Sequence, residues 1–182
     1  MSLIIRVARV DDAQAFAAIY APIVAGTHAS FENEPPNDAE MERRIRSTLE
    51  QTPWLAAECD GAIAGYAYAG RHRERAGYRW AVDVSVYLDE RFRGRGIGRA
   101  LYDRLLALLE QQGFRRAYAG VALPNDASVG LHRALGFEPI GIYRRVGWKA
   151  GRWYDVMWLG RDVGPDEGDA QPPEPIPFAR LQ

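Results

Sequence analysis

The sequence predicts an α/β (α+β) fold in which a mixed, mostly antiparallel sheet is flanked by helices. Three observations support this prediction. Apolar and polar side chains alternate from Val82 to Leu88, as is typical of a strand. A glycine-rich stretch and an amphipathic helix follow that strand directly. Short apolar runs separated by turn residues precede and follow this unit. The expected order is β-α-α-β-β-β-α-β-α-β-β, and this mixture of strands and helices indicates an α/β or α+β architecture.

The first half of the chain is expected to place two helices between strands. Acidic residues are favoured at helix N-caps, and glycine or proline commonly ends a helix. An Asp-Gly pair between two apolar runs is a strong hairpin signal. The expected elements are a strand at 3–9, a helix capped by Asp11-Asp12 and ended by Gly26, a loop at 27–37, a helix capped by Asp38 and ended by Pro53, and strands at 54–58 and 63–69 around Asp60-Gly61.

The second half begins with a charged loop at 70–77 that has no apolar pattern. The helix after the glycine-rich stretch carries leucines on one face and is expected to end at Gly113. A crossover through this helix would leave the strands on either side of it parallel and adjacent. The remaining expected elements are a strand at 114–123, a short helix at 128–135, and a last hairpin with strands at 138–146 and 153–159 around residues 147–151.

The chain of 182 residues is long enough for one domain, and 47% of its residues are hydrophobic, enough for a substantial core. We expect a folded domain over residues 1–160 and a C-terminal arm over residues 161–182. The last segment is rich in proline, glycine and acidic residues and poor in apolar ones. The arm is therefore expected to be extended and to stay outside the packed core.

Composition excludes several classes of protein. The net charge is −1, so no basic field favours nucleic acid or an anionic membrane as partner. No apolar run approaches the ~20 residues of a membrane span, and the N-terminus lacks the apolar core of a signal peptide. Cys59 is the single cysteine, which rules out an internal disulfide and favours a core role. The three histidines form no close-spaced ligand motif, so no metal site is expected. The expected location is the cytoplasm.

The glycine-rich stretch is a candidate anion site. Glycines let the backbone approach a phosphate closely, and free N–H groups at a helix N-terminus favour negative charge. The spacing fits neither the dinucleotide fingerprint G-x-G-x-x-G/A nor the nucleotide P-loop G-x-x-x-x-G-K-[ST]. An ordinary glycine turn at the start of a helix is the alternative. The pattern present is R-x-x-G-x-G within Arg93-Gly94-Arg95-Gly96-Ile97-Gly98-Arg99, directly after a Val-Tyr-Leu strand end.

This motif resembles the pyrophosphate loop of the GCN5-related N-acetyltransferases. Further segments look like those of one branch, the phosphinothricin and methionine sulfone or sulfoximine N-acetyltransferases, and extend the resemblance over roughly residues 4–159. The resemblance implies the GCN5-related acetyltransferase fold, direct acetyl transfer from acetyl-CoA to a primary amine, and a homodimer. The segments are Tyr78 to Tyr87, Gln112-Gly113-Phe114, Leu123 to Val129, Leu131 to Phe137 and Gly147 to Val156.

The resemblance also implies where acetyl-CoA binds. The backbone of Val86, Tyr87 and Leu88 would carry the pantetheine arm and donate to the oxyanion, from a β-bulge that is common there in the family. The stretch 93–99 would hold the pyrophosphate. Asn125 matches a cofactor-contacting asparagine of the family. Its other expected role is to cap the next helix, and the two roles can coexist.

Asp83 and His132 are the candidate catalytic residues. Asp83 interrupts an apolar segment, and the family usually has glutamate there, so this carboxylate is retracted by about 1.5 Å. A bridging water would span the gap to the amine, whereas burial or a relay to His132 would be needed to make the acidic carboxylate an effective base. A free aspartic acid, with a pKa of ~3.9, is a weak base for an ammonium group, and an imidazole, with ~6.5, is closer to the task. Which residue is base and which is acid stays open, and an ion pair of Asp83 with an arginine is the structural alternative.

The loop before the Val82 strand is rich in arginine. Guanidinium forks are suited to binding a carboxylate or a phosphinate. We therefore expect Arg73, Arg75 and Arg79 to bind an anionic group of the acceptor, with a solvated charged loop as the alternative. Phe31 and Tyr78 are candidate apolar walls of the acceptor pocket, and core packing is equally compatible with either.

The expected function is transfer of an acetyl group from acetyl-CoA to the amino group of a small L-amino acid such as phosphinothricin, methionine sulfone or methionine sulfoximine. Two alternatives stay open. One is a protein or peptide N-terminal acetyltransferase on the same fold. The other is a CoA-binding regulatory module without turnover, which remains an alternative because an aspartate stands at position 83 where the family usually has a glutamate.

Overall fold

The computed structural model describes residues 2–165, 168 and 170–181 of the chain. The helices and strands follow the order that the sequence predicts. Short 3-10 turns lie at Val10–Asp12, Ala76–Tyr78, Glu90–Phe92 and Phe178–Arg180. The longer elements are β1 (Leu3–Val7), α1 (Ala13–Gly26), α2 (Asp38–Gln51), β2 (Trp54–Cys59), β3 (Ala62–Arg71), β4 (Ala81–Leu88), α3 (Ile97–Gln112), β5 (Arg116–Ala122), α4 (Asp126–Ala134), β6 (Glu138–Lys149) and β7 (Arg152–Asp162).

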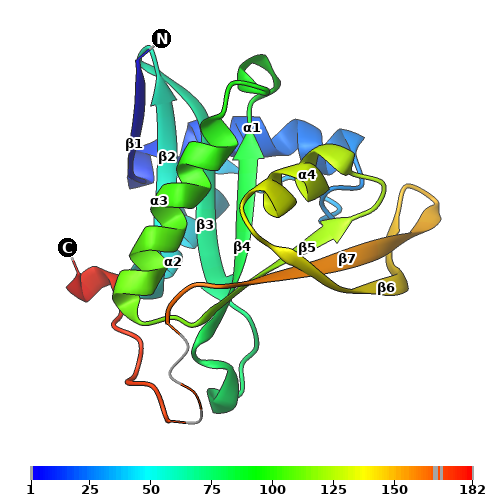
Figure 1. Cartoon of the computed structure of the whole chain (residues 1–182). Coiled ribbons are helices and arrows are strands. Elements are labelled where there is room, and N and C mark those ends of the chain that lie inside the picture. Colours follow the sequence, from blue (N-terminus) through cyan, green and yellow to red (C-terminus); the bar gives the residue numbers. More distant parts are fainter. Residues whose placement is uncertain (1, 166–167, 169, 182) are drawn as a thin grey trace.

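The described strands form one seven-stranded sheet in the order β1-β2-β3-β4-β5-β7-β6 (Figure 1). Every neighbouring pair is antiparallel except β4 and β5, which run parallel. The helix α3 connects these two strands, as a parallel pair requires. The predicted fold class and the predicted parallel pair are therefore confirmed.

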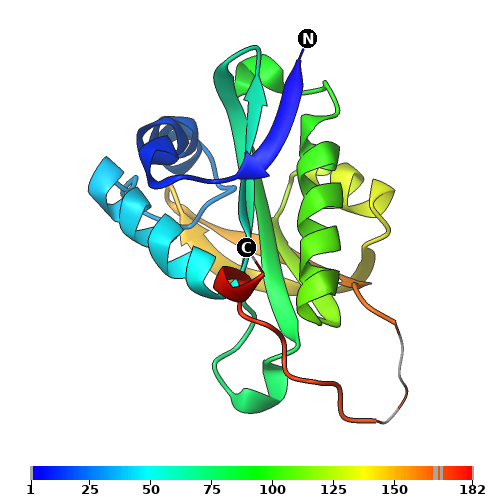
Figure 2. The same ribbon diagram turned by 90° about the vertical axis from the view of Figure 1, so that its left-hand side faces the viewer.

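Helices cover both faces of the sheet. Figure 2 shows α1 and α2 on one face and α3 on the other. One apolar core, which includes Phe16 and Trp54, lies between the sheet and the α1–α2 pair. A second core, which includes Leu101 and Leu105, lies between the sheet and α3. None of the described helices has the length and hydropathy that a membrane crossing requires.

The helix ends confirm one expected signal and correct two expected N-caps. Gly113 ends α3 with φ 91°, as expected. Asn37 rather than Asp38 caps α2, because its Oδ1 accepts from the N–H of Glu40 at 2.9 Å. The side chain of Asp12, expected at the cap of α1, instead accepts two hydrogen bonds of 2.7 Å from the guanidinium of Arg6.

The last hairpin is tighter than expected. The strand β6 continues through residues 147–149, so the predicted five-residue connection at 147–151 is wrong. The turn consists of Ala150 and Gly151, whose φ angles are 47° and 79°. Positive φ at both central residues gives the backbone twist that a two-residue hairpin needs. Trp148 and Trp153 consequently become cross-strand partners.

The C-terminal segment returns to the domain. Phe178 is 2% exposed and belongs to the core beneath α3. The N–H of Ile176 donates to the Gln112 carbonyl oxygen at 2.7 Å, and Nε2 of Gln112 donates to the Ile176 carbonyl oxygen at 2.7 Å. The expectation that this segment stays outside the core is wrong for Phe178. Residues 166, 167, 169 and 182 of the expected arm lie outside the described residues, and the boundary at 160/161 stays a prediction.

Candidate active site

The two parallel strands separate near the middle of the sheet. β4 pairs with β5 only from Ala81 to Asp83, whereas it pairs with β3 as far as Leu88. The edge of β4 that faces β5 therefore has no strand partner from Val84 to Leu88 among the described residues. The register with β3 is continuous, so the expected β-bulge at 86–88 is wrong. The separation of the strands, rather than a bulge, leaves backbone groups of β4 available to a ligand.

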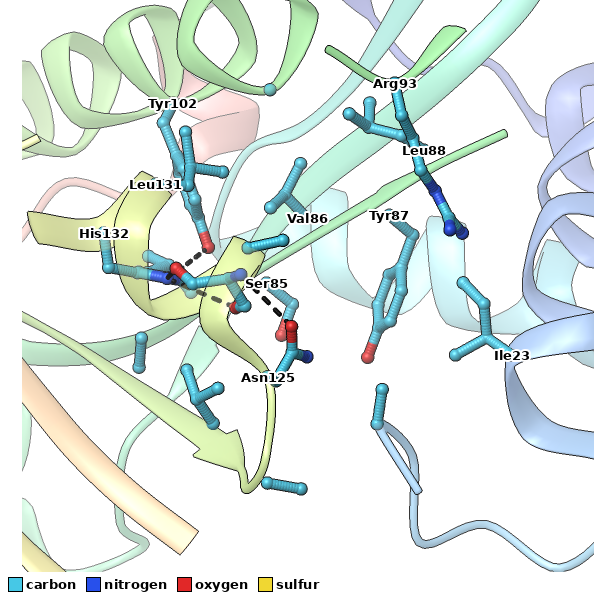
Figure 3. Close-up of a pocket in the computed structure, with 18 of the residues that line it drawn as sticks. Ile23, Ser85, Val86, Tyr87, Leu88, Arg93, Tyr102, Asn125, Leu131 and His132 are labelled. Carbon is cyan, nitrogen blue, oxygen red and sulfur yellow. Dashed lines mark hydrogen bonds between the residues drawn. The ribbon is translucent and has the colours of Figure 1, made fainter. Parts of the chain in front are cut away.

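A cavity of about 660 Å³ occupies this gap (Figure 3). This volume lies within the ~300–1,000 Å³ that is usual for small-molecule sites. The cavity joins the free edge of β4 to the N-termini of α3 and α4 and to the end of α1. Its walls include residues 84–88, 93–94, 96–99, 119–122, 124–125 and 127–128. The predicted cofactor residues of β4, most of the glycine-rich stretch and Asn125 thus line one cavity.

The glycine-rich stretch has the backbone of an anion-binding turn. Gly94 and Gly96 have φ angles of 73° and 78°, and Gly96 caps α3. A Cβ at either position would meet nothing within 4 Å, so the left-handed backbone, not crowding, requires glycine. The first N–H groups of α3 have no partner within the helix, and Gly98 in its first turn lines the cavity. This geometry fits the pyrophosphate of acetyl-CoA.

The arginines of this stretch take different positions. Arg93 and Arg99 line the cavity. Arg95 is not among the residues that line it, and its guanidinium carbon lies 5.5 Å from the ring centroid of Phe92. The Nε of Arg99 lies 3.7 Å from an Asp103 carboxylate oxygen, a solvent-exposed pair that leaves its charge near the cavity. Two of the three predicted arginines are therefore placed to contact an anion in the cavity.

Asn125 caps α4, as expected, and lies at the wall of the cavity. Its Oδ1 accepts from the N–H of Ser128 at 3.1 Å, which caps α4, and the residue also lines the cavity (Figure 3). Capping consumes one lone pair of the amide oxygen and leaves the amide N–H₂ group for another partner.

His132 lies on α4 at 3% exposure. Its Nδ1 is 2.7 Å from the carbonyl oxygen of Ser128, so Nδ1 carries a proton and donates it. Its Nε2 is 3.0 Å from the hydroxyl of Tyr102 (Figure 3), and because Nδ1 carries the ring proton, Nε2 accepts a hydrogen bond from that hydroxyl. Burial lowers the pKa of His132, the larger effect, and its bond to Ser128 opposes the shift. The ring is therefore neutral, with both nitrogens bonded.

Asp83 lies on the opposite face of β4 from Val82 and Val84, which pack beneath α3. Its Oδ1 is 2.6 Å from Nδ1 of His72. Burial raises the pKa of Asp83, and the hydrogen bond from His72 and the charge of Arg73 counteract the rise. The predicted relay from Asp83 to His132 is not present, because the two side chains bond to different partners.

Sequence reasoning missed His72. The signal that could have found it is the register of the β3–β4 hairpin. Gly70 pairs with Asp83 and Arg71 with Val82, which brings residue 72 to the start of β4. Hairpin register follows from the turn and the apolar pattern, and the length of the loop at 72–80 hides it here.

The arginines before β4 do not act as one group. The Nη1 of Arg73 donates to the carbonyl oxygen of His72 at 2.7 Å, which keeps this guanidinium beside the His72–Asp83 pair. Arg75 is exposed. Arg79 forms an ion pair with Glu174 of the C-terminal segment and donates from Nε to the Ala76 carbonyl oxygen at 2.7 Å. The structure thus places Arg73 beside Asp83 and pairs Arg79 with the C-terminal segment.

The two predicted apolar walls lie at different places. The ring of Tyr78 is 6.0 Å from the ring of His72. The ring of Phe31 covers Gly147 so closely that a Cβ there would fall 2.1 Å from it. His28, which sequence reasoning did not single out, lines the cavity and stacks on Tyr154 at 4.5 Å.

In the described part of the chain, no group of three or more His, Cys, Asp or Glu residues could hold a metal ion.

Comparisons with known proteins agree with this geometry. Residues 5–158 match the acetyltransferase (GNAT) domain. A phosphinothricin N-acetyltransferase of Alcaligenes faecalis is 42% identical over 93% of this chain and 86% of its own length. An L-methionine sulfoximine/L-methionine sulfone acetyltransferase of Pseudomonas aeruginosa is 36% identical over 91% of this chain and 97% of its own. The crystal structure of a phosphinothricin acetyltransferase from Sinorhizobium meliloti in complex with acetyl-CoA is 36% identical, with a TM-score of 0.90 over 97% of this chain and 96% of that one. The chain therefore belongs to the GNAT acetyltransferase family.

Proposed function

We propose that this protein transfers an acetyl group from acetyl-CoA to the amino group of a small L-amino acid of the phosphinothricin, methionine sulfone or methionine sulfoximine type. The observation that carries the proposal is the cavity at the β4–β5 separation. It connects a glycine-rich helix N-terminus to an unpaired strand edge. The names of the relatives, which align over most of both chains, support this class of acceptor.

The donor half of the site would hold acetyl-CoA. The N–H groups at the start of α3, with Arg93 and Arg99, would bind the pyrophosphate. The free edge of Val86, Tyr87 and Leu88 would take up the amide groups of the pantetheine arm as a peptide strand adds to a sheet edge. An N–H of the same edge would stabilise the oxyanion that forms at the thioester carbonyl.

The acceptor half would lie on the Asp83 face of the sheet. The ammonium group of the amino acid must lose a proton before it attacks, and the partly buried carboxylate of Asp83 lies on this face. The guanidinium of Arg73 would bind the carboxylate of the acceptor, with Tyr78 as a wall. His132 would serve the thioester side, where its neutral ring fixes the hydroxyl of Tyr102 at the cavity.

A panel of acceptors tests this function. We expect acetyl-CoA to release free thiol with phosphinothricin, methionine sulfone or methionine sulfoximine, and mass spectrometry to detect the N-acetyl product. Turnover with peptide N-termini but not with these amino acids would transfer the function to a peptide acetyltransferase. Acetyl-CoA binding in calorimetry without thiol release on any acceptor would instead identify a regulatory module.

We also infer that the protein forms a homodimer in the cytoplasm, where acetyl-CoA is available. Large apolar side chains on the β6–β7 hairpin support the dimer, because such a surface is uncommon on a monomer. They include Ile140, Tyr143, Trp148 and Trp153, exposed to 61%, 52%, 55% and 47%. Light scattering tests the dimer. Trp148→Glu should yield monomers, whereas the control Ile4→Glu, on the edge strand β1, should not. A monomeric wild type would overturn the inference.

A further inference from the structure

The shortest polar contact of Asp83 joins it to a histidine at the end of the β3–β4 hairpin. His72 follows directly after β3, and its N–H donates to the Ala81 carbonyl oxygen at 3.4 Å. Its Nδ1 lies 2.6 Å from Oδ1 of Asp83. This distance is at the short end for an N–H···O bond to a carboxylate, as expected for a charge-assisted bond. Backbone pairing and side-chain bonding therefore fix His72 against the strand that carries Asp83.

Aromatic rings from three further elements hold the imidazole. The ring of Tyr118 on β5 lies 4.5 Å from it, and the rings of Tyr78 and Trp158 each lie 6.0 Å from it. The His72 side chain is 14% exposed. In the described part of the chain, its Nε2 has no hydrogen-bond partner. The ring is thus oriented on several sides and keeps one nitrogen for a ligand.

The charged and titratable groups around the pair come from several elements. Asp83 lies on β4, and Arg73 on the adjacent loop, with its guanidinium carbon 5.7 Å from the ring centroid of Trp158. Tyr118 and Tyr78 contribute phenol groups from β5 and from the turn before β4. Asp83 is the carboxylate hydrogen-bonded to the imidazole, and the charge of Arg73 acts on the same carboxylate.

We propose that His72 is the general base of the acetyl transfer and that Asp83 orients it. This inference rests on the proposed function. Asp83 would accept the Nδ1–H bond, and Nε2 would remove a proton from the ammonium group of the acceptor. An unperturbed imidazole is about 2.6 pK units more basic than an aspartate and therefore better suited to this step. The arrangement gives the short Asp83 side chain a longer reach through the ring.

The protons and electron pairs of the transfer balance without another reactant. Of the three protons on the ammonium group, one moves to Nε2 of His72 and later to water. A second ends on the sulfur of CoA, and the third stays on the amide nitrogen. The nitrogen lone pair forms the bond to the carbonyl carbon, and the electrons of the broken carbon–sulfur bond leave with sulfur.

Variants separate a histidine base from an aspartate base. We expect His72→Gln to lower kcat by about 10²–10⁴-fold, the range for a positioned base. Asp83→Asn should lower kcat by a comparable factor. The double variant should have a kcat little below that of the less active single variant, because the two residues act as one unit. The control Glu74→Gln, in the same loop, should keep wild-type turnover, and all variants should bind CoA equally in calorimetry. Near-wild-type kcat in His72→Gln with a large loss in Asp83→Asn would overturn the proposal.

The pH profile distinguishes a base from a structural residue. As the pH approaches the pKa of the acceptor amine, solvent supplies the free amine, and the deficit of His72→Gln should shrink. A deficit that stays constant with pH would mean that His72 only supports the fold, and would overturn the base role.

Nitrogen-15 NMR of the histidine rings supplies a readout without turnover. We expect His72 in the Nδ1–H tautomer at alkaline pH in the wild type, and a loss of that preference in Asp83→Asn. An Nε2–H tautomer in the wild type would overturn the pair. If the wild type acetylates no acceptor, the proposed function and the base role both fail, and the tautomer still decides whether Asp83 orients the ring.

Discussion

The hydroxyl of Tyr102 and the Nε2 of His132 lie 3.0 Å apart and form a buried hydrogen bond between α3 and α4. Because Nδ1 of the same ring donates to the carbonyl oxygen of Ser128, Nε2 must accept from the tyrosine. Burial also raises the pKa of Tyr102, so the phenol keeps its proton. The neutral ring of His132 therefore links α3 and α4 at the cavity wall through two hydrogen bonds.

We predict that His132→Gln lowers the free energy of unfolding at neutral to alkaline pH by about 1–3 kcal/mol, the cost of disturbing buried hydrogen bonds. The sign of the pH dependence follows from burial, which lowers the pKa of folded His132 below its ordinary value of ~6.5. Between these two pKa values the unfolded chain binds more protons than the folded one. Wild-type stability therefore falls as the pH drops below ~6.5, and the variant lacks that component.

Urea unfolding of both proteins at about pH 8 and about pH 5.5 measures this difference. The stability gap between wild type and His132→Gln should shrink at the lower pH. His28 and His72 are present in both proteins, so their own titrations cancel in the comparison. A gap that widens on acidification would show that His132 is charged in the folded protein.

The glycine-rich turn gives a second prediction. Gly96→Val should weaken CoA binding by about ten-fold or more, since a β-branched residue at φ 78° costs about 1–3 kcal/mol and displaces the turn. The space around the position is open, so the folded domain should tolerate the change. Gly130→Val on α4 is the matched control, because a Cβ added there also meets nothing within 4 Å and the φ of Gly130 is ordinary. Equal CoA affinity of both variants in calorimetry would remove this turn from the cofactor site.

Much of this framework can be read from local sequence. Alternation from Val82 to Leu88, the glycines after it and the leucine face of α3 each reflect a short-range rule, and the structure follows them. The two-residue turn at Ala150-Gly151 could not be predicted in this way, because alanine rarely adopts a positive φ. The burial of Phe178 could not be predicted either, since a single aromatic residue in a proline-rich segment has no periodicity that would indicate burial.

The candidate site depends on contacts that local rules do not encode. The Asp83–His72 pair requires the register across a long loop, and the Arg79–Glu174 pair requires the path of the C-terminal segment. In both contacts the two residues lie in different elements, separated along the chain by a loop or by several strands and helices. For this reason the sequence could nominate Asp83 but not its partner, and it grouped arginines that the fold separates.

The effect of Asp83→Glu depends on the space beside Asp83, which the ring of His72 occupies. The extra methylene moves the carboxylate outward by about 1.5 Å, toward a ring that already lies at 2.6 Å. We therefore predict that Asp83→Glu lowers kcat by about ten-fold or more without changing CoA affinity. Adding His72→Ala makes room for the longer side chain and should restore part of the loss by letting the glutamate reach the amine. A gain in kcat for Asp83→Glu alone would show that the aspartate is too short for its task.

Phe178 should contribute to stability although it comes from the C-terminal segment. Its side chain is 2% exposed beneath α3, so Phe178→Ala should lower the free energy of unfolding by about 3–5 kcal/mol. Ile176→Ala removes a side chain that is 43% exposed from the same segment, and it should cost much less. Chemical denaturation measures both. Equal stability of Phe178→Ala and wild type would mean that the segment detaches in solution.

Arg73 should set the preference for acceptors that carry a carboxylate. Its guanidinium lies beside the His72–Asp83 pair, whereas that of Arg79 pairs with Glu174. A lysine keeps the charge but loses the bidentate fork, so Arg73→Lys should raise KM for phosphinothricin by about ten-fold and change kcat less. Arg79→Lys is the matched control and should leave both constants near wild type.

The wild type should also favour an amino acid over its decarboxylated amine by about ten-fold or more, because the lost anion leaves a charged partner unpaired. Steady-state kinetics on such a pair of acceptors decides the matter, and equal kcat/KM for the two would point to polyamines or peptides as the acceptors.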